Sequence, residues 1–236
     1  MKNILMLFIF ALTALGVSAS SSYSDKTENR NLNNFHAVKV SAGIDLYLKM
    51  GDSEEVKVVA DDDIIDRIIT EVKDGTLHIY MKSNNNIFNW HFNTGAKKVY
   101  VSVKELDEID ASSGSDVVSE NTLSGETLDV EASSGSDVTL DVVYKNFSID
   151  ISSGSDAKIS GKTKNFIAEA SSGSDVTARN LESVNCKVRS SSGSDISVNV
   201  SDEISAKASS GGDIVYYGNP QVKEINESSG GDVKQR

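Results

Sequence analysis

A short polar pentapeptide, Ser-Ser-Gly-Ser-Asp, recurs through the second half of this 236-residue chain. Five copies are followed by two Ser-Ser-Gly-Gly-Asp variants, and successive central glycines are 21, 19, 19, 20, 18 and 19 residues apart. A period this regular predicts an array of one structural unit. Because glycine readily adopts positive φ, we expect each pentapeptide to form a tight corner. The corner glycines are Gly114, Gly135, Gly154, Gly173, Gly193, Gly211 and Gly230.

Apolar residues alternate with polar residues on both sides of the corners. In one repeat they are Phe147, Ile149 and Ile151 before the corner, and Ala157 and Ile159 after it. Alternation with a period of two predicts two short strands per repeat, each with one buried face. The repeat is too short for a propeller blade, which takes about 40 residues or more. A hairpin array would not need the same corner at every turn, whereas coils stacked about 4.8 Å apart place equivalent residues in columns.

These patterns predict an all-β fold, a parallel β-helix of about 19-residue coils over residues 111–236. Residues 35–110 lack the regular repeat, and we expect them to form a β-rich N-terminal cap and the first coils. Within this region, Ser41–Asp45 resembles a degenerate corner. Asp63–Glu71 is predicted to be one short helix with an aspartate as its N-cap.

The first 19 residues have the pattern of a secretory signal peptide. Lys2 precedes an apolar run from Ile4 to Leu15, and small residues lead to Ala19. The run is shorter than the roughly 20 residues that a membrane-spanning helix needs, so we expect cleavage and no transmembrane segment afterwards. The mature chain would then be exported to the periplasm, the cell surface or the medium. Residues 20–34 are polar, and we expect them to be disordered.

Composition argues against several classes of partner. The chain has 23 Lys and Arg against 35 Asp and Glu, a net charge of −12 at pH 7. An acidic surface without a basic cluster argues against nucleic acid and anionic membranes. The one cysteine, Cys186, allows no intramolecular disulfide, so apolar burial must stabilise the fold. Cys186 falls in the inward column of Leu128, Phe147, Phe166 and Ile204, where we expect a buried thiol.

Three further features carry a resemblance to a known family. They are the N-terminal signal sequence, the early segment VKVSAGIDLYLKMGD, and DDDIIDRIITEVKDGTLHIY ahead of the tandem corners. With them the chain resembles DUF2807, the "putative auto-transporter adhesin, head GIN domain" family of exported proteins common in Bacteroidetes. The resemblance covers most of the mature chain. It implies a right-handed parallel β-helix similar to pectin lyase-like folds, an adhesive role and no established catalytic residues.

Each corner ends in an aspartate, and stacked coils would place these side chains in one column. Carboxylates about 4.8 Å apart repel each other by roughly 1 kcal/mol per pair in water. The structural interpretation is that they accept hydrogen bonds from local amides. The alternative is a cation column that holds Ca²⁺. We prefer the structural interpretation and expect no cofactor. The residues are Asp116, Asp137, Asp156, Asp175, Asp195, Asp213 and Asp232.

A second column of outward residues precedes the corners. It contains four acids and then two bases, and in pectate lyases stacked carboxylates hold Ca²⁺ while an arginine acts as the base. Asp150, Glu169 and Arg189 superficially offer that set. The simpler interpretation is a solvated face whose charges satisfy one another. The column is Asp110, Glu131, Asp150, Glu169, Arg189, Lys207 and Asn226.

An aromatic stripe lies in the segment NIFNWHFNTG. Phe88, Trp90 and Phe92 would share one face of a candidate strand. We expect them in the core at the end of the solenoid. If they are exposed, they are possible surface contacts for a sugar or a protein.

No catalytic or cofactor-binding residue is specified by a local motif. His36, His78 and His91 lack partners at metal-ligand spacing, and no Ser–His pair marks a nucleophilic site. We therefore expect an exported, non-enzymatic, adhesin-like β-helix protein whose partner is an envelope or host-surface protein or a glycan. The alternatives are a calcium-assisted, pectate lyase-like enzyme and a structural envelope protein without a dedicated ligand. The oligomeric state is not specified.

Overall fold

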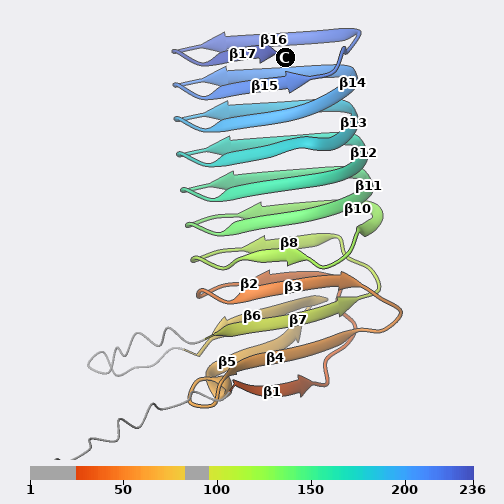
Figure 1. Ribbon diagram of the computed structural model, residues 1–236, viewed down its shortest axis with the longest axis vertical. Helices are drawn as coiled ribbons and strands as arrows, with labels where there is room; N and C mark the ends of the chain where they lie inside the picture. Colours follow the sequence, from red (N-terminus) through yellow and green to blue (C-terminus); the bar gives the residue numbers. More distant parts are fainter. Residues whose placement is uncertain (1–24, 83–95) are drawn as a thin grey trace, which may run out of the picture.

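The computed structural model describes residues 25–82 and 96–236. In these ranges the chain forms seventeen strands, all in one hydrogen-bonded sheet, and a single 3₁₀ helix. The sheet is wound into a tall right-handed solenoid, with the N-terminal elements at one end and the C-terminus at the other (Figure 1). The predicted all-β parallel β-helix is confirmed.

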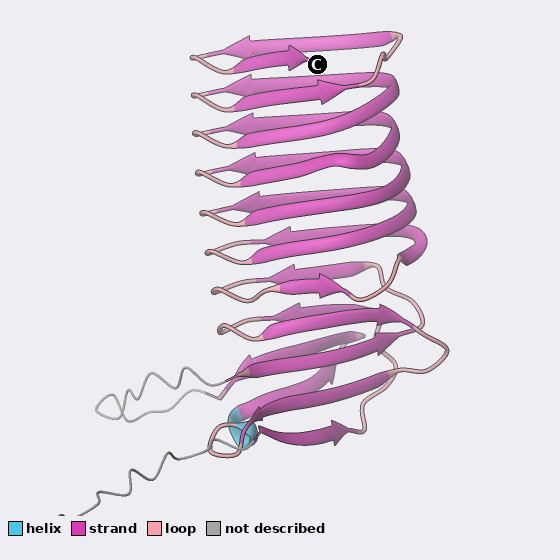
Figure 2. Ribbon diagram, viewed as in Figure 1, coloured by secondary structure: helices cyan, strands magenta, loops and turns pink. Residues whose placement is uncertain are grey.

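The elements form three groups along the solenoid (Figure 2). The covering elements at the N-terminal end are β1 (Asp25–Arg30), β4 (Glu55–Asp61), η1 (Ile65–Arg67) and β5 (Ile68–Lys73). The first coils are β2 (Ala37–Val40) with β3 (Asp45–Met50), β6 (Thr76–Met81) with β7 (Lys97–Val103), and β8 (Glu108–Ala111) with β9 (Val117–Ser119). The remaining coils are built from β10 (Leu123–Ala132), β11 (Asp137–Ser152), β12 (Asp156–Ser171), β13 (Asp175–Ser191), β14 (Asp195–Ser209), β15 (Asp213–Tyr217), β16 (Val222–Ser228) and β17 (Asp232–Gln235).

The strands β11 to β14 each run from one corner, round a bend, to the next corner. β11 and β12 pair in parallel from Asp137 opposite Asp156 to Ser152 opposite Ser171. The prediction of two short strands per repeat is therefore wrong for these coils. Each repeat forms one long strand, because residues of the bend also pair with the neighbouring coils. Equivalent residues of successive coils lie in columns along the axis.

The core is a set of inward columns inside the solenoid. The Phe147 and Phe166 rings stack with centroids 5.4 Å apart and planes 4° from parallel. Leu128 and Cys186 continue the same column on either side, and all four side chains are buried. Burying a phenylalanine side chain stabilises the fold by about 1.5–3 kcal/mol. Such columns therefore stabilise this fold in the absence of an intramolecular disulfide.

The first coils do not stack in sequence order. The β2–β3 coil lies between two later coils, because β2 pairs with both β6 and β8 and β3 pairs with both β7 and β9. Its corner is Ser41–Asp45, where Ala42 and Gly43 have φ of 71° and 65°. The Gly43 N–H donates to the carbonyl of Ser113 in the next coil (3.0 Å). The degenerate corner is therefore a true corner of the stack.

The polar segment before the first coil is partly ordered, contrary to the predicted disorder of residues 20–34. Residues 25–30 form β1, which pairs antiparallel with β4 from Asp25 opposite Asp61 to Arg30 opposite Val56. Pairing satisfies backbone groups at the edge of β4, and a polar strand suits an edge that faces solvent. Residues 20–24 lie outside the described residues.

The predicted helix over Asp63–Glu71 is wrong for most of its length. Only η1 is helical, its N-cap is Ile64 without a side-chain hydrogen bond, and the following residues form β5. β5 pairs antiparallel with β6, with Ile69 opposite Tyr80. The β-branched pair Ile68–Ile69 favours a strand, and the ladder with β6 outweighs the weak helical propensity of this short segment.

The C-terminal end is closed by polar side chains at inward positions. In β16, Lys223 stands opposite Ile204 and Glu227 opposite Ala208, so charged residues replace apolar ones in two core columns. The Lys223 Nζ donates to Gln235 Oε1 (2.9 Å), and the Val233 N–H donates to Glu227 Oε1 (2.7 Å). Solenoids need polar terminal repeats, and here the last coil serves as one.

Candidate functional site

Each corner bends through two consecutive left-handed residues. At one corner, Ser153 has φ of 59° and Gly154 has φ of 73°. The predicted left-handed glycine is confirmed, whereas the left-handed serine before it was not predicted. A Cβ at Gly154 would meet no atom within 4 Å, so glycine is favoured there by backbone conformation and not by lack of space.

Hydrogen bonds between coils hold the corners in register. The Gly154 N–H donates to the carbonyl of Ser172 in the next coil (3.3 Å). The fourth residue of the pentapeptide, for example Ser155, is fully buried; its N–H donates to Ser174 Oγ (3.2 Å), and its own Oγ accepts from the Ser136 N–H (3.1 Å). These serines form an internal structural ladder, so they are not available to a ligand.

The two variant corners differ for a steric reason. At Gly212, which replaces this serine, a Cβ would lie 2.6 Å from Ser190 Oγ and 2.7 Å from the Ser191 backbone nitrogen. The Gly212 N–H instead donates to the carbonyl of Ser209 within the same corner (3.0 Å). The change from Ser-Ser-Gly-Ser-Asp to Ser-Ser-Gly-Gly-Asp therefore marks a tighter corner with no room for a fourth side chain.

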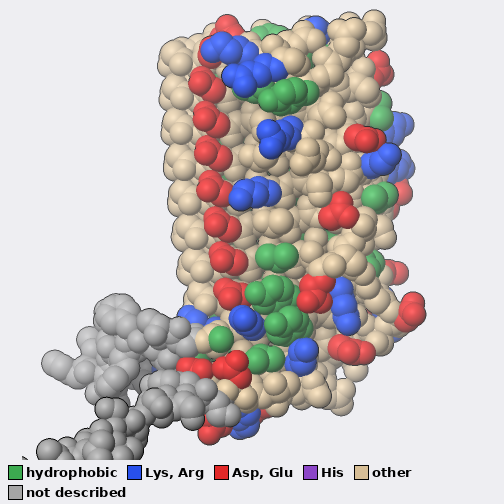
Figure 3. All heavy atoms as spheres, in the orientation of Figure 1, with side chains coloured by type: hydrophobic (Ala, Val, Ile, Leu, Met, Phe, Trp, Pro, Cys, Tyr) green, Lys and Arg blue, Asp and Glu red, His purple; other side chains and the backbone are tan. Residues whose placement is uncertain are grey.

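The predicted aspartate column exists, and Figure 3 shows it as a straight red line beside the corners. Five successive register pairs join its members from Asp137 to Asp232. Asp45 adds a member that was not predicted, since the residue after it pairs with the residue after Asp116. The column thus contains eight carboxylates on one outer edge.

Backbone amides satisfy part of this column. The Asp195 N–H donates to Asp175 Oδ1 (3.0 Å), as the structural interpretation expects. Burial, and then the neighbouring carboxylates of Asp175 and Asp213, raise the pKa of Asp195. Burial, followed by Asp137 and Asp45, likewise raises the pKa of Asp116. In the described ranges, no group of three or more His, Cys, Asp or Glu side chains converges as a metal site. The Ca²⁺ column stays a prediction.

The second predicted column is also in register, and two of its carboxylates, Asp110 and Glu169, form ion pairs. Glu169 stands between Asp150 and Arg189, and Arg189 Nη1 lies 3.5 Å from Glu169 Oε2. At the other end of the column, Lys39 forms an ion pair with Asp110. Burial and then Glu169 raise the pKa of Asp150. A hollow of about 180 Å³ lies over Glu169 and Arg189. Asp150, Glu169 and Arg189, the residues considered for lyase activity, are therefore adjacent, and Arg189 forms an ion pair with Glu169.

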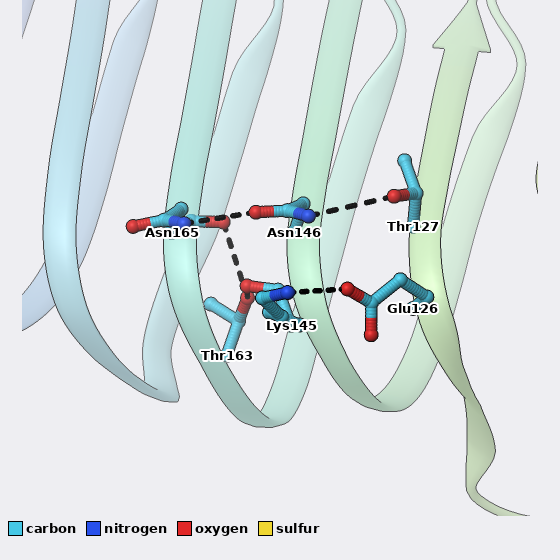
Figure 4. A network of polar contacts seen from close by, with 6 residues as sticks. All are labelled: Glu126, Thr127, Lys145, Asn146, Thr163 and Asn165. Carbon is cyan, nitrogen blue, oxygen red and sulfur yellow. Dashed lines mark hydrogen bonds and ion pairs between the residues drawn. The ribbon is translucent and has the colours of Figure 1, made fainter.

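An asparagine ladder stabilises the bend on the opposite edge from the corners (Figure 4). Asn165 Nδ2 donates to Asn146 Oδ1 (2.8 Å), and Asn185 Nδ2 donates to Asn165 Oδ1 (2.9 Å). Thr163 Oγ1 donates within the same bend to the Asn165 carbonyl (3.1 Å). We did not predict this ladder, although asparagines spaced 19 and 20 residues apart are a recognisable signal in the sequence.

Beside the ladder lies a shallow apolar hollow of about 770 Å³. Val143 and Val184 contribute to it with 46% and 38% of their surface exposed. Lys145, Lys162 and Lys164 border it, and Lys162 is 3.0 Å from a glutamate of the next coil. An apolar floor with cationic edges is suited to an anionic amphiphile. We refer to this feature as the bend hollow.

Two tyrosines stack on the outer face that carries the aspartate column. The Tyr47 and Tyr100 rings have centroids 4.8 Å apart and planes 15° from parallel. The Lys57 Nζ lies 4.3 Å from the centroid of the Tyr100 ring. Figure 3 shows hydrophobic side chains gathered on the lower half of this face, next to the acidic column. We did not predict this tyrosine pair from the sequence.

The other predicted residues fall into three situations. Phe88, Trp90, Phe92 and His91 lie outside the described residues. Cys186 is buried as predicted; burial raises the pKa of its thiol to about 12, and Ser183 Oγ lies 3.1 Å away, so the thiol is unreactive. His36 and His78 are exposed and partly exposed on the first coils.

Among residues 25–82 and 96–236, the structure contains no helix with the length and hydrophobicity of a membrane span.

Solved structures from Bacteroidetes species share this fold. A "putative adhesin" from Bacteroides fragilis matches with a TM-score of 0.83 and 21% identity, covering 91% of this chain and 98% of that chain. From Parabacteroides distasonis, a "putative lipid binding protein" (18% identity) and a "putative adhesin" (20% identity) each match with a TM-score of 0.69 over 91% of this chain and 98% of theirs. At these identities the likeness concerns the fold alone.

The sequence also matches a family model, which shows the family in addition to the fold. None of the curated proteins compared with the chain matches it. One family model matches residues 34–220, which include the first coils, all corners except the last and most of the aspartate column. The chain therefore belongs to the DUF2807 family, "putative auto-transporter adhesin, head GIN domain".

Proposed function

We propose that this chain is an exported, non-enzymatic, adhesin-like binding protein of the bacterial envelope. Family membership and the similarity to structures named as adhesins support an adhesin-like role. The observation that carries the proposal is the aspartate column, eight carboxylates in register along one edge. The signal-like N-terminus supports export.

The column suits binding because the fold fixes its spacing. Carboxylates repeat at about 4.8 Å along a stack whose corners are tied together by hydrogen bonds, so little order is lost when a partner binds. The net charge of −12 would steer cationic partners to this face and repel polyanions. A partner with several positive groups would gain from multivalent contact.

The test is binding of residues 20–236 to arrays of envelope proteins, host-surface proteins and glycans. Replacing Asp156 and Asp175 together with asparagine should weaken binding to the partner by about tenfold or more, because two adjacent carboxylates are lost. The matched control replaces Asp52 and Asp202, which lie outside the column, and should retain binding. Binding that the control weakens equally would reflect net charge alone and would contradict a role for the column.

Two other outcomes would replace this proposal. If nothing on the arrays binds, a structural role in the envelope becomes the better account. If acidic polysaccharides are cleaved in the presence of Ca²⁺, and cleavage is lost in Arg189→Ala, the column of Asp150, Glu169 and Arg189 is enzymatic.

The bend hollow supports a second candidate function, binding of an anionic lipid. Its exposed Val143 and Val184 offer an apolar surface, and Lys164 makes no ion pair with another described residue. The similar structure named as a lipid binding protein is in keeping with this candidate. Titration with sodium oleate should show saturable binding that Val184→Asp abolishes and Val222→Asp, at an exposed valine elsewhere, does not. Equal binding by both variants would contradict it.

A further inference from the structure

The tyrosine pair is part of a layered stack that runs along the solenoid axis. Lys57 in β4 stands opposite Tyr100 in β7, Tyr100 opposite Tyr47 in β3, and Tyr47 opposite Val118 in β9. One face of the Tyr100 ring therefore meets the Lys57 ammonium and the other meets Tyr47. The remaining face of the Tyr47 ring points along the stack towards Val118.

That remaining face has only small side chains beside it. Val118 branches at Cβ and ends at Cγ, so it covers the base of a neighbouring ring but not its outer part. The next residue along the same row, Thr139, is also short. Both tyrosines are partly exposed, as is Val118. A planar group could therefore continue the stack from Tyr47 over Val118.

The aspartate column borders this place. Asp45 and Asp116 lie two residues before Tyr47 and Val118 on the same outer face, which places their Cα atoms about 6.6 Å from the stack. Lys98 stands opposite Asp45 in the strand that carries Tyr100, on the covered side of the Tyr47 ring. Asp116 belongs to the same coil as Val118, so it is the carboxylate on the open side of that ring.

From this juxtaposition we propose that Tyr47, Val118 and Asp116 form a docking site for an arginine side chain of a protein partner. A guanidinium is planar, so it stacks on an aromatic face, and its forked donors match a carboxylate in two parallel hydrogen bonds. The inference rests on the proposed binding function and gives the partner a chemical identity, a basic segment that presents arginine. The acidic column beyond Asp116 would hold further cations of the same segment.

The alternatives fit this site less well. A lysine ammonium is compact and strongly hydrated, so it gains less from the ring and cannot bridge to the carboxylate bidentately. A sugar ring could stack on Tyr47, but it would leave the negative charge of Asp116 and Asp137 without compensation. The single-sign column beside the ring therefore favours a planar cation.

The experiment compares two fluorescein-labelled peptides of the sequence Gly-X-Gly-X-Gly, with X either arginine or lysine, by fluorescence anisotropy at low ionic strength. The arginine peptide should bind about fivefold or more tightly than the lysine peptide. Tyr47→Leu should remove that preference, and Tyr47→Phe should keep it, because the phenylalanine ring offers the same face. Asp116→Asn should weaken the arginine peptide by about fivefold.

Tyr217→Leu is the matched control, since Tyr217 is a partly exposed tyrosine at the far end of the same face and stacks on no other ring among the described residues. Circular dichroism melts establish that each variant is folded. Equal affinity for both peptides, or an unchanged preference in Tyr47→Leu, overturns the arginine site. The proposed function survives that result if Asp156→Asn with Asp175→Asn still weakens the array partner, and it fails separately if nothing binds the column. Tyr47-dependent binding of a neutral glycan in place of the peptides would also overturn the inference.

Discussion

At the scale of single residues, glycine has two different reasons for its place in this chain. Gly154 at a corner has φ of 73° with open space around a Cβ position. Gly161 at a bend has φ of 113°, and a Cβ there would lie 2.0 Å from the carbonyl oxygen of Val142. Glycine is favoured at position 154 only by its positive φ. At position 161 it is favoured both by positive φ and because a side chain would collide with the backbone.

The two positions should therefore respond differently to the same substitution. We expect Gly154→Ala to lower the free energy of unfolding by about 1–2 kcal/mol, from left-handed strain alone. Gly154→Val should cost more, because a branched Cβ is disfavoured at positive φ. Gly161→Ala should cost about 3 kcal/mol or more, since a backbone clash adds to the strain. Urea denaturation measures all three, and Gly154→Asn, which tolerates this φ, is the control. Equal losses at Gly154 and Gly161 would contradict the distinction.

Residue roles were predictable where one repeat position has one purpose. The corner glycines, the aspartate column and the buried Cys186 follow from the alternation and the 19-residue period. The left-handed Ser153 did not follow, because serine rarely adopts that conformation and only the closed corner imposes it. Tyr47 and Tyr100 were missed for another reason. They are 53 positions apart and meet only because later strands fold beneath earlier ones.

At the scale of elements, the bends depend on a side-chain ladder as much as on the main chain. Asn165 sits in the middle of it, donating to Asn146 and accepting from Asn185. Asn165→Ala should lower the free energy of unfolding by about 1–2 kcal/mol, because both neighbours lose a partner in a half-buried setting. Asn219→Ala, in the loop between β15 and β16, is the matched control and should change it by less than about 0.5 kcal/mol. Thermal unfolding compares the two, and an effect at Asn219 as large as at Asn165 would show that the ladder contributes little.

Element predictions were accurate for the repeats and poor for the cap. The cap sequence has the same apolar alternation, but its strands β4 and β5 run antiparallel to their partners, which no period encodes. The spacing of Ile and Asp residues in Asp63–Glu71 is compatible with a helix and with a strand. Pairing with β6 makes most of its second half a strand. β1 was overlooked because a polar edge strand has no hydrophobic pattern to reveal it.

At the scale of the whole molecule, the stacking of repeats along the solenoid was predictable from the sequence, whereas the structure of its two ends was not predicted. The stack order of the first coils depends on which edge a later strand joins, and that choice is made by tertiary pairing. The C-terminal closure could have been foreseen, because Lys223 and Glu227 occupy positions that are apolar in β10 to β14 with one exception. That one exception is the buried Ser190.

The charge distribution predicts an unusual dependence of stability on pH. Burial and like-charge neighbours raise the pKa of Asp116, Asp150 and Asp195, so the folded state binds protons more tightly than the unfolded chain. Their contribution to stability should therefore rise as pH falls through their folded pKa values. His36, whose pKa is raised by its hydrogen bond and charge contact with Asp107, adds in the same direction, because its contribution is lost as pH rises through its folded pKa. Glu71, whose pKa is lowered by Lys73, acts in the opposite direction, because its contribution is lost as pH falls through its folded pKa.

Urea denaturation between pH 4.5 and 7.5 measures this dependence. Asp195→Asn should flatten the profile, because it removes one carboxylate with a raised pKa. Asp202→Asn, an exposed carboxylate outside the column, should leave the slope unchanged. Stability that increases steadily up to pH 7.5 would contradict the prediction.

Calcium removal tests how the aspartate column as a whole is satisfied. Ca²⁺ prefers six to eight oxygen ligands at 2.3–2.6 Å, and two adjacent aspartates in single file supply at most four. Some of these oxygens already accept amide hydrogen bonds, as Asp175 does from Asp195. We therefore expect chelation by EDTA to leave the melting temperature unchanged within about 1 °C, and millimolar Ca²⁺ and Mg²⁺ to raise it by small and equal amounts through screening of the repulsion. A rise of several degrees with Ca²⁺ alone, lost in Asp156→Asn, would instead establish a specific cation column along the corners.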